Sequence, residues 1–180
     1  LGCGDLIQEG WINLDCVELP GVDVVHDLNK YPYPFKDNQF DEVMAKDVLE
    51  HLNDVVQAME EIYRIMRPGS SLFIEVPFWN SWRTVSDPTH KRGFNEIIWE
   101  FFDPDKERCK LRPYYTKARF HIIRIDYYIE PFGPHFSIFG KWIRNRWIKN
   151  ILNKFRTLLN FIVSPFIFKS HMLQMINNIL

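Results

Sequence analysis

The sequence predicts an open α/β sheet, and three observations along its first half support this fold class. Short apolar runs alternate with turn residues, as buried strands do in such sheets. One segment in that half, from Asn53 to about Met66, places its apolar residues at helical spacing. Three of the expected strands are followed within two residues by an aspartate. This order of strands, loops and a helix is typical of an α/β domain.

The individual elements follow from local patterns. Strands are expected over residues 11–14, 22–25, 40–45, 71–76 and 120–130. The helix is expected to begin at Asn53, because an asparagine side chain can accept hydrogen bonds from the free N–H groups of a first turn. Val55, Met59 and Ile62 share its apolar face, and the dipeptide Pro68-Gly69 is expected to end it.

The charges of the 180-residue chain are unevenly distributed. Residues 1–130 carry 15 Lys and Arg and 23 Asp and Glu, whereas residues 131–180 carry seven basic residues and no acid. The overall charge of −1 excludes a uniformly basic nucleic-acid binder, so no nucleic-acid partner is expected. Three cysteines without C-x-x-C spacing predict reduced thiols in a cytoplasmic protein, with no disulfide framework and no metal site.

The aspartates at the strand ends are the most informative pattern. Ligands of open α/β sheets bind outside the carboxyl ends of the strands, so Asp15, Asp27 and Asp47 are expected at one rim. Alternatively, each of them can start a turn or cap a helix. The turn Gly2-Cys3-Gly4 comes before them, and glycine lets a backbone approach a ligand closely.

The glycine turn favours a nucleoside without phosphates. The third glycine of the dinucleotide fingerprint is absent, and Asp15 follows Gly4 after only eleven residues. No basic side chain near the turn favours a pyrophosphate. The Asp15 carboxylate can accept hydrogen bonds from both hydroxyls of a ribose.

Seven motifs stand in order along the same region. They read L-G-C-G at 1–4, G-W-I-N-L-D at 10–15, V-D-V-V-H-D-L at 22–28, P-F-K-D-N-Q-F-D-E-V at 34–43, V-L-E-H-L at 48–52, E-I-Y-R-I-M-R-P-G-S at 61–70 and V-P at 76–77. This series resembles the class I S-adenosylmethionine-dependent methyltransferases, methyltransferase type 11-like, and in particular a group often encoded with glycan-synthesis enzymes. The resemblance covers about residues 1–94, and Ser70 replaces the second glycine of the family's P-G-G turn.

The resemblance implies a fold and a cofactor. It implies a Rossmann-like, doubly wound, mostly parallel sheet that binds S-adenosyl-L-methionine and releases S-adenosyl-L-homocysteine. The chain starts at Leu1, inside the glycine turn, so the family's preceding strand is expected to be cut off.

The resemblance also implies the cofactor-binding residues, which are Gly2, Cys3, Gly4, Asp15, Asp27, Leu28 and Asp47. The glycine turn would line the methionine part of the cofactor, and Asp15 would hold the ribose hydroxyls. Asp27 and the backbone amide of Leu28 would contact the adenine. Asp47 would lie under the cofactor and the substrate.

Three side chains are candidates for catalysis on the acceptor side, namely Asp47, His51 and His90. A hydroxyl that receives a methyl group benefits from a base that takes its proton. His51 can instead be a helix-start histidine satisfied by backbone groups, and His90 can belong to an ordinary surface loop. Glu50 is expected to be a solvated acid in a first helical turn.

The surroundings of His90 suggest the class of acceptor. Lys91 and Arg92 follow it, and three aromatic residues, Phe78, Trp79 and Trp82, precede it. Such a set suits a polar, sugar-like substrate.

The C-terminal segment is expected to form a separate element. Residues 1–136 are predicted to be the methyltransferase domain and residues 137–180 a basic, amphipathic helical extension. Over residues 140–162, apolar side chains such as Trp147 lie opposite basic ones such as Arg146. This pattern is typical of a helix on a membrane surface and also of a helix packed on the sheet or on a second subunit. Peripheral membrane contact and dimerisation through residues 140–162 both remain open.

The predicted function is methyl transfer from S-adenosylmethionine to a hydroxyl of a small-molecule sugar or glycan intermediate. Two alternatives come from other classes. A nicotinamide-dependent oxidoreductase is disfavoured by the absent third glycine and the short spacing to Asp15. A non-catalytic protein that retains the fold and docks on a membrane or a partner would make use of the basic C-terminal segment.

Overall fold

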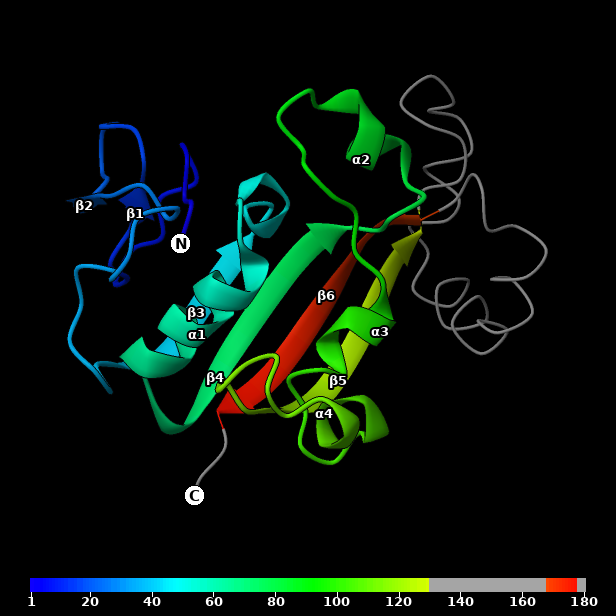
Figure 1. The fold of residues 1–180 in the computed structure, drawn as a ribbon. Coiled ribbons are helices and arrows are strands. Elements are labelled where there is room, and N and C mark those ends of the chain that lie inside the picture. The colour runs from blue at the N-terminus through cyan, green and yellow to red at the C-terminus, as the bar shows by residue number, and fades with distance from the viewer. Residues whose placement is uncertain (130–167, 178–180) are drawn as a thin grey trace, which may run out of the picture.

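The computed structural model describes residues 1–129 and 168–177, which form a larger sheet, a smaller sheet and helices packed against them (Figure 1). The larger sheet has the strand order β3 (Phe40–Lys46), β4 (Met66–Pro77), β6 (Phe168–Asn177) and β5 (Phe120–Ile129). The smaller sheet is a parallel pair of β1 (Leu14–Asp15) and β2 (Val24–Val25). Five of the six strands therefore overlap segments where the sequence predicts a strand, although β4 begins at Met66 instead of residue 71 and contains the Pro68-Gly69 dipeptide that was expected to end the helix.

Helix α1 (Val55–Ile65) connects the parallel strands β3 and β4 and supplies much of the core. Its N-cap is Asp54, whose carboxylate accepts a hydrogen bond of 2.9 Å from the Gln57 N–H. The predicted cap, Asn53, lies one residue earlier and donates its own N–H to the Asn29 side chain. The start of the helix was therefore predicted one residue too early.

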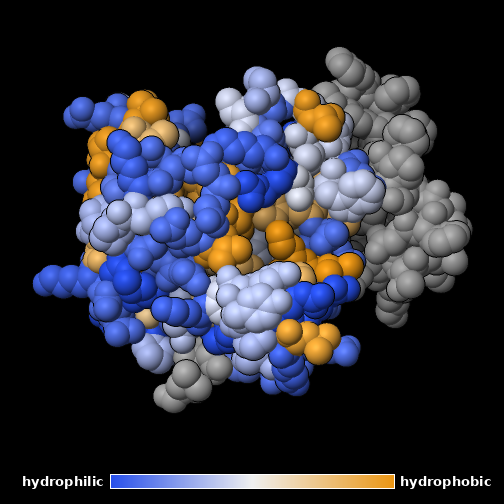
Figure 2. All heavy atoms as spheres, in the orientation of Figure 1, coloured by the Kyte–Doolittle hydropathy of each residue, from blue (hydrophilic) through white to orange (hydrophobic). Residues whose placement is uncertain are grey.

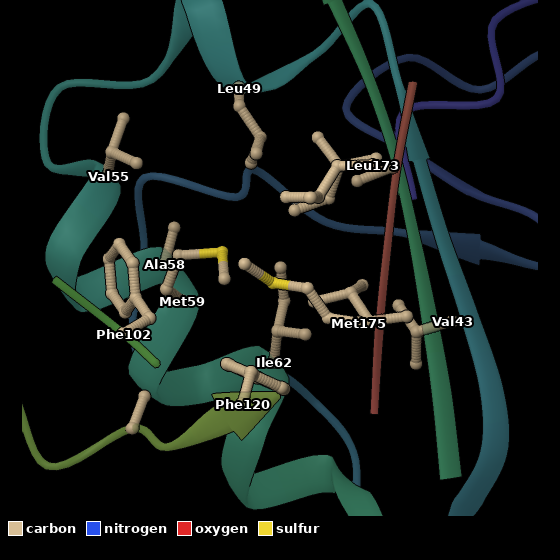
Figure 3. Close-up of a cluster of buried hydrophobic side chains, with 14 of the residues drawn as sticks. Val43, Leu49, Val55, Ala58, Met59, Ile62, Phe102, Phe120, Leu173 and Met175 are labelled. Carbon is tan, nitrogen blue, oxygen red and sulfur yellow. The ribbon is translucent and has the colours of Figure 1, made fainter. Parts of the chain in front are cut away.

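The buried face of α1 packs on the larger sheet. Met59 and Ile62 have no exposed surface and belong to the same cluster as Val43, Leu173 and Met175. Figure 3 shows these side chains pointing toward one another between the helix and the strands. This contact fixes α1 beside the strands whose carboxyl ends form the candidate site.

Strand β6 makes the sheet mixed. It pairs antiparallel with β4 on one side and with β5 on the other, and it lies between them (Figure 1). The prediction of a mostly parallel sheet is corrected here, as is part of the predicted helical extension over 137–180, because Phe168–Asn177 is a strand of the sheet. The amphipathic helix predicted over 140–162 lies outside the described residues.

The described helices cover one face of the larger sheet. Leu72, Ile74 and Val76 of β4 point into the core with α1, whereas Phe73 and Glu75 on the opposite face are partly exposed. Trp99 of α3 (Glu96–Trp99) joins the same core cluster as α1. Within residues 1–129 and 168–177 the sheet is thus covered from one side, and the expected doubly wound arrangement is not reproduced there.

The shorter helices lie in the connections. These are η1 (Leu49–His51), α2 (Trp82–Ser86) and α4 (Glu107–Leu111). Across the described part of the chain, no helix has both the length and the apolar character that crossing a bilayer requires.

Residues 1–3 join the two sheets. The Leu1 nitrogen donates to the Met44 carbonyl of β3 at 2.6 Å, and the Cys3 N–H donates to the Leu14 carbonyl of β1 at 3.1 Å. Hydrophobic residues gather at the left edge of Figure 2. Leu6, Val17 and Val25, which lie near β1 and β2 in the sequence, are exposed apolar residues. The glycine turn therefore lies between β1 and β3, at the carboxyl ends of both strands.

Candidate active site

The glycine turn packs directly against the end of β3. A Cβ atom on Gly2, which has a φ of +63°, would lie 2.5 Å from a methyl group of Val48, so only glycine fits this approach. A Cβ atom on Gly4 would have no other heavy atom within 4 Å, so this side of the turn is open. Burial and the nearby Asp15 charge raise the pKa of the Cys3 thiol, which favours its neutral form. The turn thus packs closely against Val48 at Gly2, leaves open space beside Gly4 and carries an uncharged Cys3 side chain.

Asp15 is held in place by backbone groups. Its Oδ2 accepts the Gly4 N–H at 2.8 Å, and its Oδ1 accepts the Val17 N–H at 3.1 Å. Partial burial alone would raise the pKa of Asp15, but these hydrogen bonds outweigh it and the pKa is lowered. Because a carboxylate oxygen has a second lone pair, both oxygens can still accept a hydroxyl.

Asp27 and Leu28 follow β2 in a similar turn. Oδ1 of Asp27 accepts hydrogen bonds from the Asn29 backbone and side chain, at 2.9 and 3.1 Å, and these bonds lower its pKa. The Leu28 side chain is buried, and its carbonyl accepts the Tyr33 hydroxyl at 3.2 Å. The two predicted adenine contacts therefore lie on a turn that is held by hydrogen bonds from Asn29 and Tyr33.

A pocket of about 480 Å³ lies beside the end of β3 and the end of β4. Its lining combines three acids, two histidines, one arginine and a partly exposed tryptophan, namely Asp47, Glu50, Asp87, His51, His90, Arg83 and Trp82, with Pro77, Ser86 and Pro88. Asp47 has a φ of +47°, a region that favours glycine, and its Oδ2 lies 3.6 Å from Nη2 of Arg83. The three predicted catalytic residues, Asp47, His51 and His90, all line this one pocket.

The loop over residues 79–93 brings His90 to His51. It leaves the sheet after β4 and returns beside it, because Phe78 and Phe94 form a β-bridge. A Cβ atom on Gly93 would lie 2.5 Å from the Trp79 Cα, so the two ends of the loop come together only with glycine at this position. The rings of His51 and His90 meet edge to face, with centroids 4.6 Å apart.

A chain of hydrogen bonds orients His51. The Thr89 hydroxyl donates to Oδ1 of Asp87 at 2.6 Å, and Nδ1 of His51 lies 2.9 Å from the same hydroxyl oxygen. Since the hydroxyl proton is already donated, Nδ1 is the donor to Thr89 and Nε2 keeps its lone pair. Burial and the neighbouring His90 lower the pKa of His51, which favours the neutral ring.

His90 and Glu50 form the inner wall of the pocket. Nδ1 of His90 lies 3.3 Å from the Thr84 carbonyl, and its Nε2 lies 3.8 Å from Oε1 of Glu50. Glu50 is fully buried, contrary to the expectation of a solvated acid, and burial raises its pKa to about 7. The segment after His90 lies against Glu50, since the Lys91 N–H donates to the Glu50 carbonyl at 2.9 Å.

The pocket residues Asp87 and Arg83, and Thr89, which contacts His51, were not among the predicted site residues. Asp87 and Thr89 stand in the D-P-T-H segment that contains His90, but an aspartate two residues before a threonine is a usual turn pattern, so no site role was predicted for either of them. Arg83 lies on a five-residue helix whose position depends on the return of the loop. The contact between Thr89 and His51, which are 38 residues apart in the sequence, links this loop to the histidine, and local sequence patterns do not predict it.

Part of the chain matches a known protein family. Residues 8–74 match the family described as a methyltransferase domain. The matched segment runs from before β1 into β4, so it contains the Asp15, Asp27 and Asp47 strand ends and the Glu50–His51 pair. The description of this family agrees with the resemblance that the sequence motifs carry.

Two curated relatives match over short segments. A demethylmenaquinone methyltransferase of Lactiplantibacillus plantarum is 48% identical over 44 residues, which are 24% of this chain and 19% of that protein. A demethylmenaquinone methyltransferase of Streptomyces griseus is 38% identical over 55 residues, 29% of this chain and 24% of that protein. The matches thus span a quarter or less of the relatives' own length.

A solved structure shares the fold. It is a SAM-dependent methyltransferase from Archaeoglobus fulgidus, with a TM-score of 0.56 and 19% identity. The superposition covers 91% of this chain and 74% of that one. The likeness supports the Rossmann-like α/β class with a mixed sheet.

Proposed function

We propose that this protein transfers a methyl group from S-adenosyl-L-methionine to a hydroxyl of a sugar or glycan intermediate. The match of residues 8–74 to a methyltransferase domain supports the reaction class. The observation that carries the acceptor half is the orientation of His51 by Thr89 and Asp87, which leaves a neutral ring nitrogen available in the pocket. Such a nitrogen can take the proton of an acceptor hydroxyl.

The rim over the glycine turn suits the cofactor. The open side of Gly4 would receive the methionine part, with Gly2 and Cys3 behind it. The Asp15 carboxylate would accept the ribose hydroxyls, and Asp27 with the Leu28 amide would contact the adenine. When bound, the cofactor supplies an electrophilic methyl group on a sulfonium, and the acids of the rim complement its positive charge.

The residues of the pocket would position the acceptor and handle its proton. Methyl transfer is an in-line displacement, so holding the acceptor oxygen in line supplies much of the rate. Arg83 and the face of Trp82, which is 41% exposed, are suited to a polar sugar ring. His51 would accept the proton, while Asp47 would stay on the rim paired with Arg83.

The test is an acceptor screen by mass spectrometry. The full chain is incubated with S-adenosylmethionine and separate pools of free sugars, nucleotide sugars and lipid-linked glycans, with a demethylmenaquinol arm because the curated relatives carry that name. We expect a gain of one methyl group in a glycan pool, together with acceptor-dependent formation of S-adenosylhomocysteine. Methylation confined to the quinol arm would contradict the sugar acceptor.

A binding measurement separates the other functional classes. Calorimetry with S-adenosylhomocysteine and with NAD is expected to give saturable binding of the first alone. NAD binding without S-adenosylhomocysteine binding would favour the oxidoreductase alternative. Peripheral contact or dimerisation through residues 140–162 is proposed as an accessory property, tested by liposome sedimentation and by light scattering.

A further inference from the structure

Glu50 lies in the wall of the pocket, with Nε2 of His90 3.8 Å from its Oε1. Its side chain has no exposed surface, and neither carboxylate oxygen has a hydrogen-bond partner among the described residues. A buried carboxylate of this kind is costly unless a cation or several donors compensate it. A cation in the pocket would compensate the ionised form of this carboxylate.

The two histidines present nitrogen ligands to the same point. Nδ1 of His51 is engaged by Thr89, and Nδ1 of His90 faces the Thr84 carbonyl. Histidines that bind metals almost always donate their other ring N–H to such a partner, which fixes the ring and leaves one lone pair for the ion. Both rings are thus held as metal-binding histidines usually are.

The three side chains are close enough to share one ion. One ligand atom from each of Glu50, His51 and His90 lies within 4.8 Å of the other two. The measured pair, Nε2 of His90 and Oε1 of Glu50, is 3.8 Å apart. Bonds of about 2.1 Å in a tetrahedral site place ligand atoms about 3.4 Å apart, so small side-chain rotations would complete the set.

We propose that Glu50, His51 and His90 bind a divalent transition-metal ion in the acceptor pocket. Two imidazoles with one carboxylate suit Zn²⁺, Mn²⁺ or Fe²⁺, whereas Mg²⁺ prefers oxygen ligands alone. Three protein ligands leave coordination positions for another molecule, and all three residues line the pocket. This proposal departs from the expectation, drawn from the cysteines, that the chain holds no metal.

The site deepens the proposed function, although binding of the ion itself does not depend on that function. An acceptor hydroxyl in the pocket would bind the ion as an additional ligand. The ion would lower the pKa of that hydroxyl, so its proton would pass to water through the open pocket instead of to His51. The alkoxide oxygen would then bond to the methyl carbon of S-adenosylmethionine while the methyl–sulfur bond breaks and S-adenosylhomocysteine leaves.

The first test is a titration of the full chain with Co²⁺ after treatment with a chelator, followed by visible absorption. We expect one equivalent to bind at this site, to be displaced by Zn²⁺ and to be unaffected by a large excess of Mg²⁺. Glu50→Gln and His90→Asn should each lower the Co²⁺ affinity at least about 100-fold. Thr89→Val, which removes the hydroxyl that links His51 to Asp87, should weaken binding about tenfold.

A second cluster in the molecule provides the matched control. Asp103, Asp105 and His121 also place ligand atoms within 4.8 Å of one another, and Nδ1 of His121 lies 3.0 Å from Oδ2 of Asp105. His121→Asn is expected to leave the Co²⁺ equivalent described above unchanged. Loss of that equivalent in His121→Asn, with binding retained in Glu50→Gln, would assign the metal to the other cluster and overturn the proposal.

Folding and function are separated from binding in the same experiment. Each variant is compared with the wild type by circular dichroism and thermal unfolding, and Thr89→Val on the exposed loop tests the site if a buried variant does not fold. Equal Co²⁺ affinity in the wild type, Thr89→Val and His90→Asn would overturn the metal site. A protein that binds Co²⁺ but not S-adenosylhomocysteine would contradict the proposed function and leave the metal site standing.

Discussion

The glycine-turn rim, with Asp15 and Asp27, and the histidine pocket, with Glu50, both contain acids near the carboxyl ends of strands. The surroundings of these acids shift their pKa values in opposite directions. On the rim, backbone and side-chain N–H groups bind Asp15 and Asp27 and lower the pKa of both. In the pocket, Glu50 is buried without a hydrogen-bond partner among the described residues, and its pKa is raised to about 7. The rim thus supplies hydrogen-bond donors to its acids, whereas the pocket supplies none to the Glu50 carboxylate within the described part of the chain.

This difference indicates different roles. A carboxylate that is already ordered and ionised can accept hydroxyls at little additional cost, as recognition of a nucleoside requires. A buried, ionised carboxylate beside two oriented imidazoles is unfavourable until an ion, a proton or an acceptor molecule compensates its charge. We therefore expect substitutions on the rim to change cofactor affinity and substitutions in the pocket to change turnover.

The largest effect is expected at His51. Once an acceptor is identified, His51→Asn should lower kcat by about 10²- to 10⁴-fold, because the variant loses proton transfer to the ring or a ligand of the ion. S-adenosylhomocysteine affinity should stay within about twofold, as measured by calorimetry. A variant with normal turnover, or one that loses cofactor affinity instead, would remove the distinction between the two regions.

Asp15→Asn should produce the complementary loss. Replacing a carboxylate that is proposed to accept both ribose hydroxyls should weaken S-adenosylhomocysteine binding by about 100-fold, since hydrogen bonds to charged groups contribute about 1.5–3 kcal/mol each. Asp5→Asn in the neighbouring exposed loop is the control and should bind normally. Unchanged affinity in Asp15→Asn would rule out the ribose contact.

The strands that carry the rim could be predicted because their signals are local. Apolar runs followed by Asp15, Asp27 and Asp47 depend only on neighbouring residues, and the structure places strands in the same segments. Strand β6 could not be recognised in the same way. Its buried positions Leu173 and Met175 alternate with Gln174, but this short pattern follows a long segment with helical periodicity, and only pairing with β4 and β5 defines it.

The pocket shows the limit of sequence reasoning more clearly. His51 and His90 were chosen from motifs, and the structure brings them together, although their roles remain predictions. Glu50 was expected in solvent because a first-turn acid is favourable at a helix start. It is buried because the loop over residues 79–93 folds over it, a contact between segments that no local pattern contains.

Arg64 offers a way to disturb the rim without touching the pocket. Its guanidinium donates to the carbonyls of Tyr33 and Phe35, at 3.1 and 2.9 Å, and to the Glu61 carboxylate at 2.7 Å, and so ties the loop that follows Asp27 to α1. Arg64→Ala should lower the free energy of unfolding by about 2 kcal/mol, because these partly buried acceptors lose their donor. Urea denaturation measures this change.

Arg67→Ala is the matched control for that variant. Arg67 pairs with Asp41, but about half of the arginine side chain and 76% of the aspartate side chain are exposed. Exposed pairs contribute about 0–1 kcal/mol, so the control should lose clearly less stability than Arg64→Ala. Co²⁺ binding in the pocket should be unchanged in both variants. Loss of Co²⁺ binding in Arg64→Ala would show that the two regions are coupled.

The smallest expected effect is a pH dependence at Glu61. Partial burial would raise the pKa of Glu61, but bonds from Arg64 and from the Tyr33 N–H at 2.7 Å outweigh it and lower the pKa. A carboxyl whose pKa is lower in the folded state stabilises the fold above its unfolded pKa. That stabilisation is lost as the pH falls through the folded value.

Glu61→Gln should therefore be less stable than the wild type by about 1 kcal/mol at pH 7, and the difference should shrink between about pH 5 and pH 3. Urea denaturation at a series of pH values measures it, with Glu18→Gln at an exposed position as the control. A difference that stays constant with pH would mean that Glu61 acts through packing rather than charge. The carboxylates that order the first region would then owe their positions to the shape of the loop, and the electrostatic contrast with Glu50 would be confined to Asp15 and Asp27.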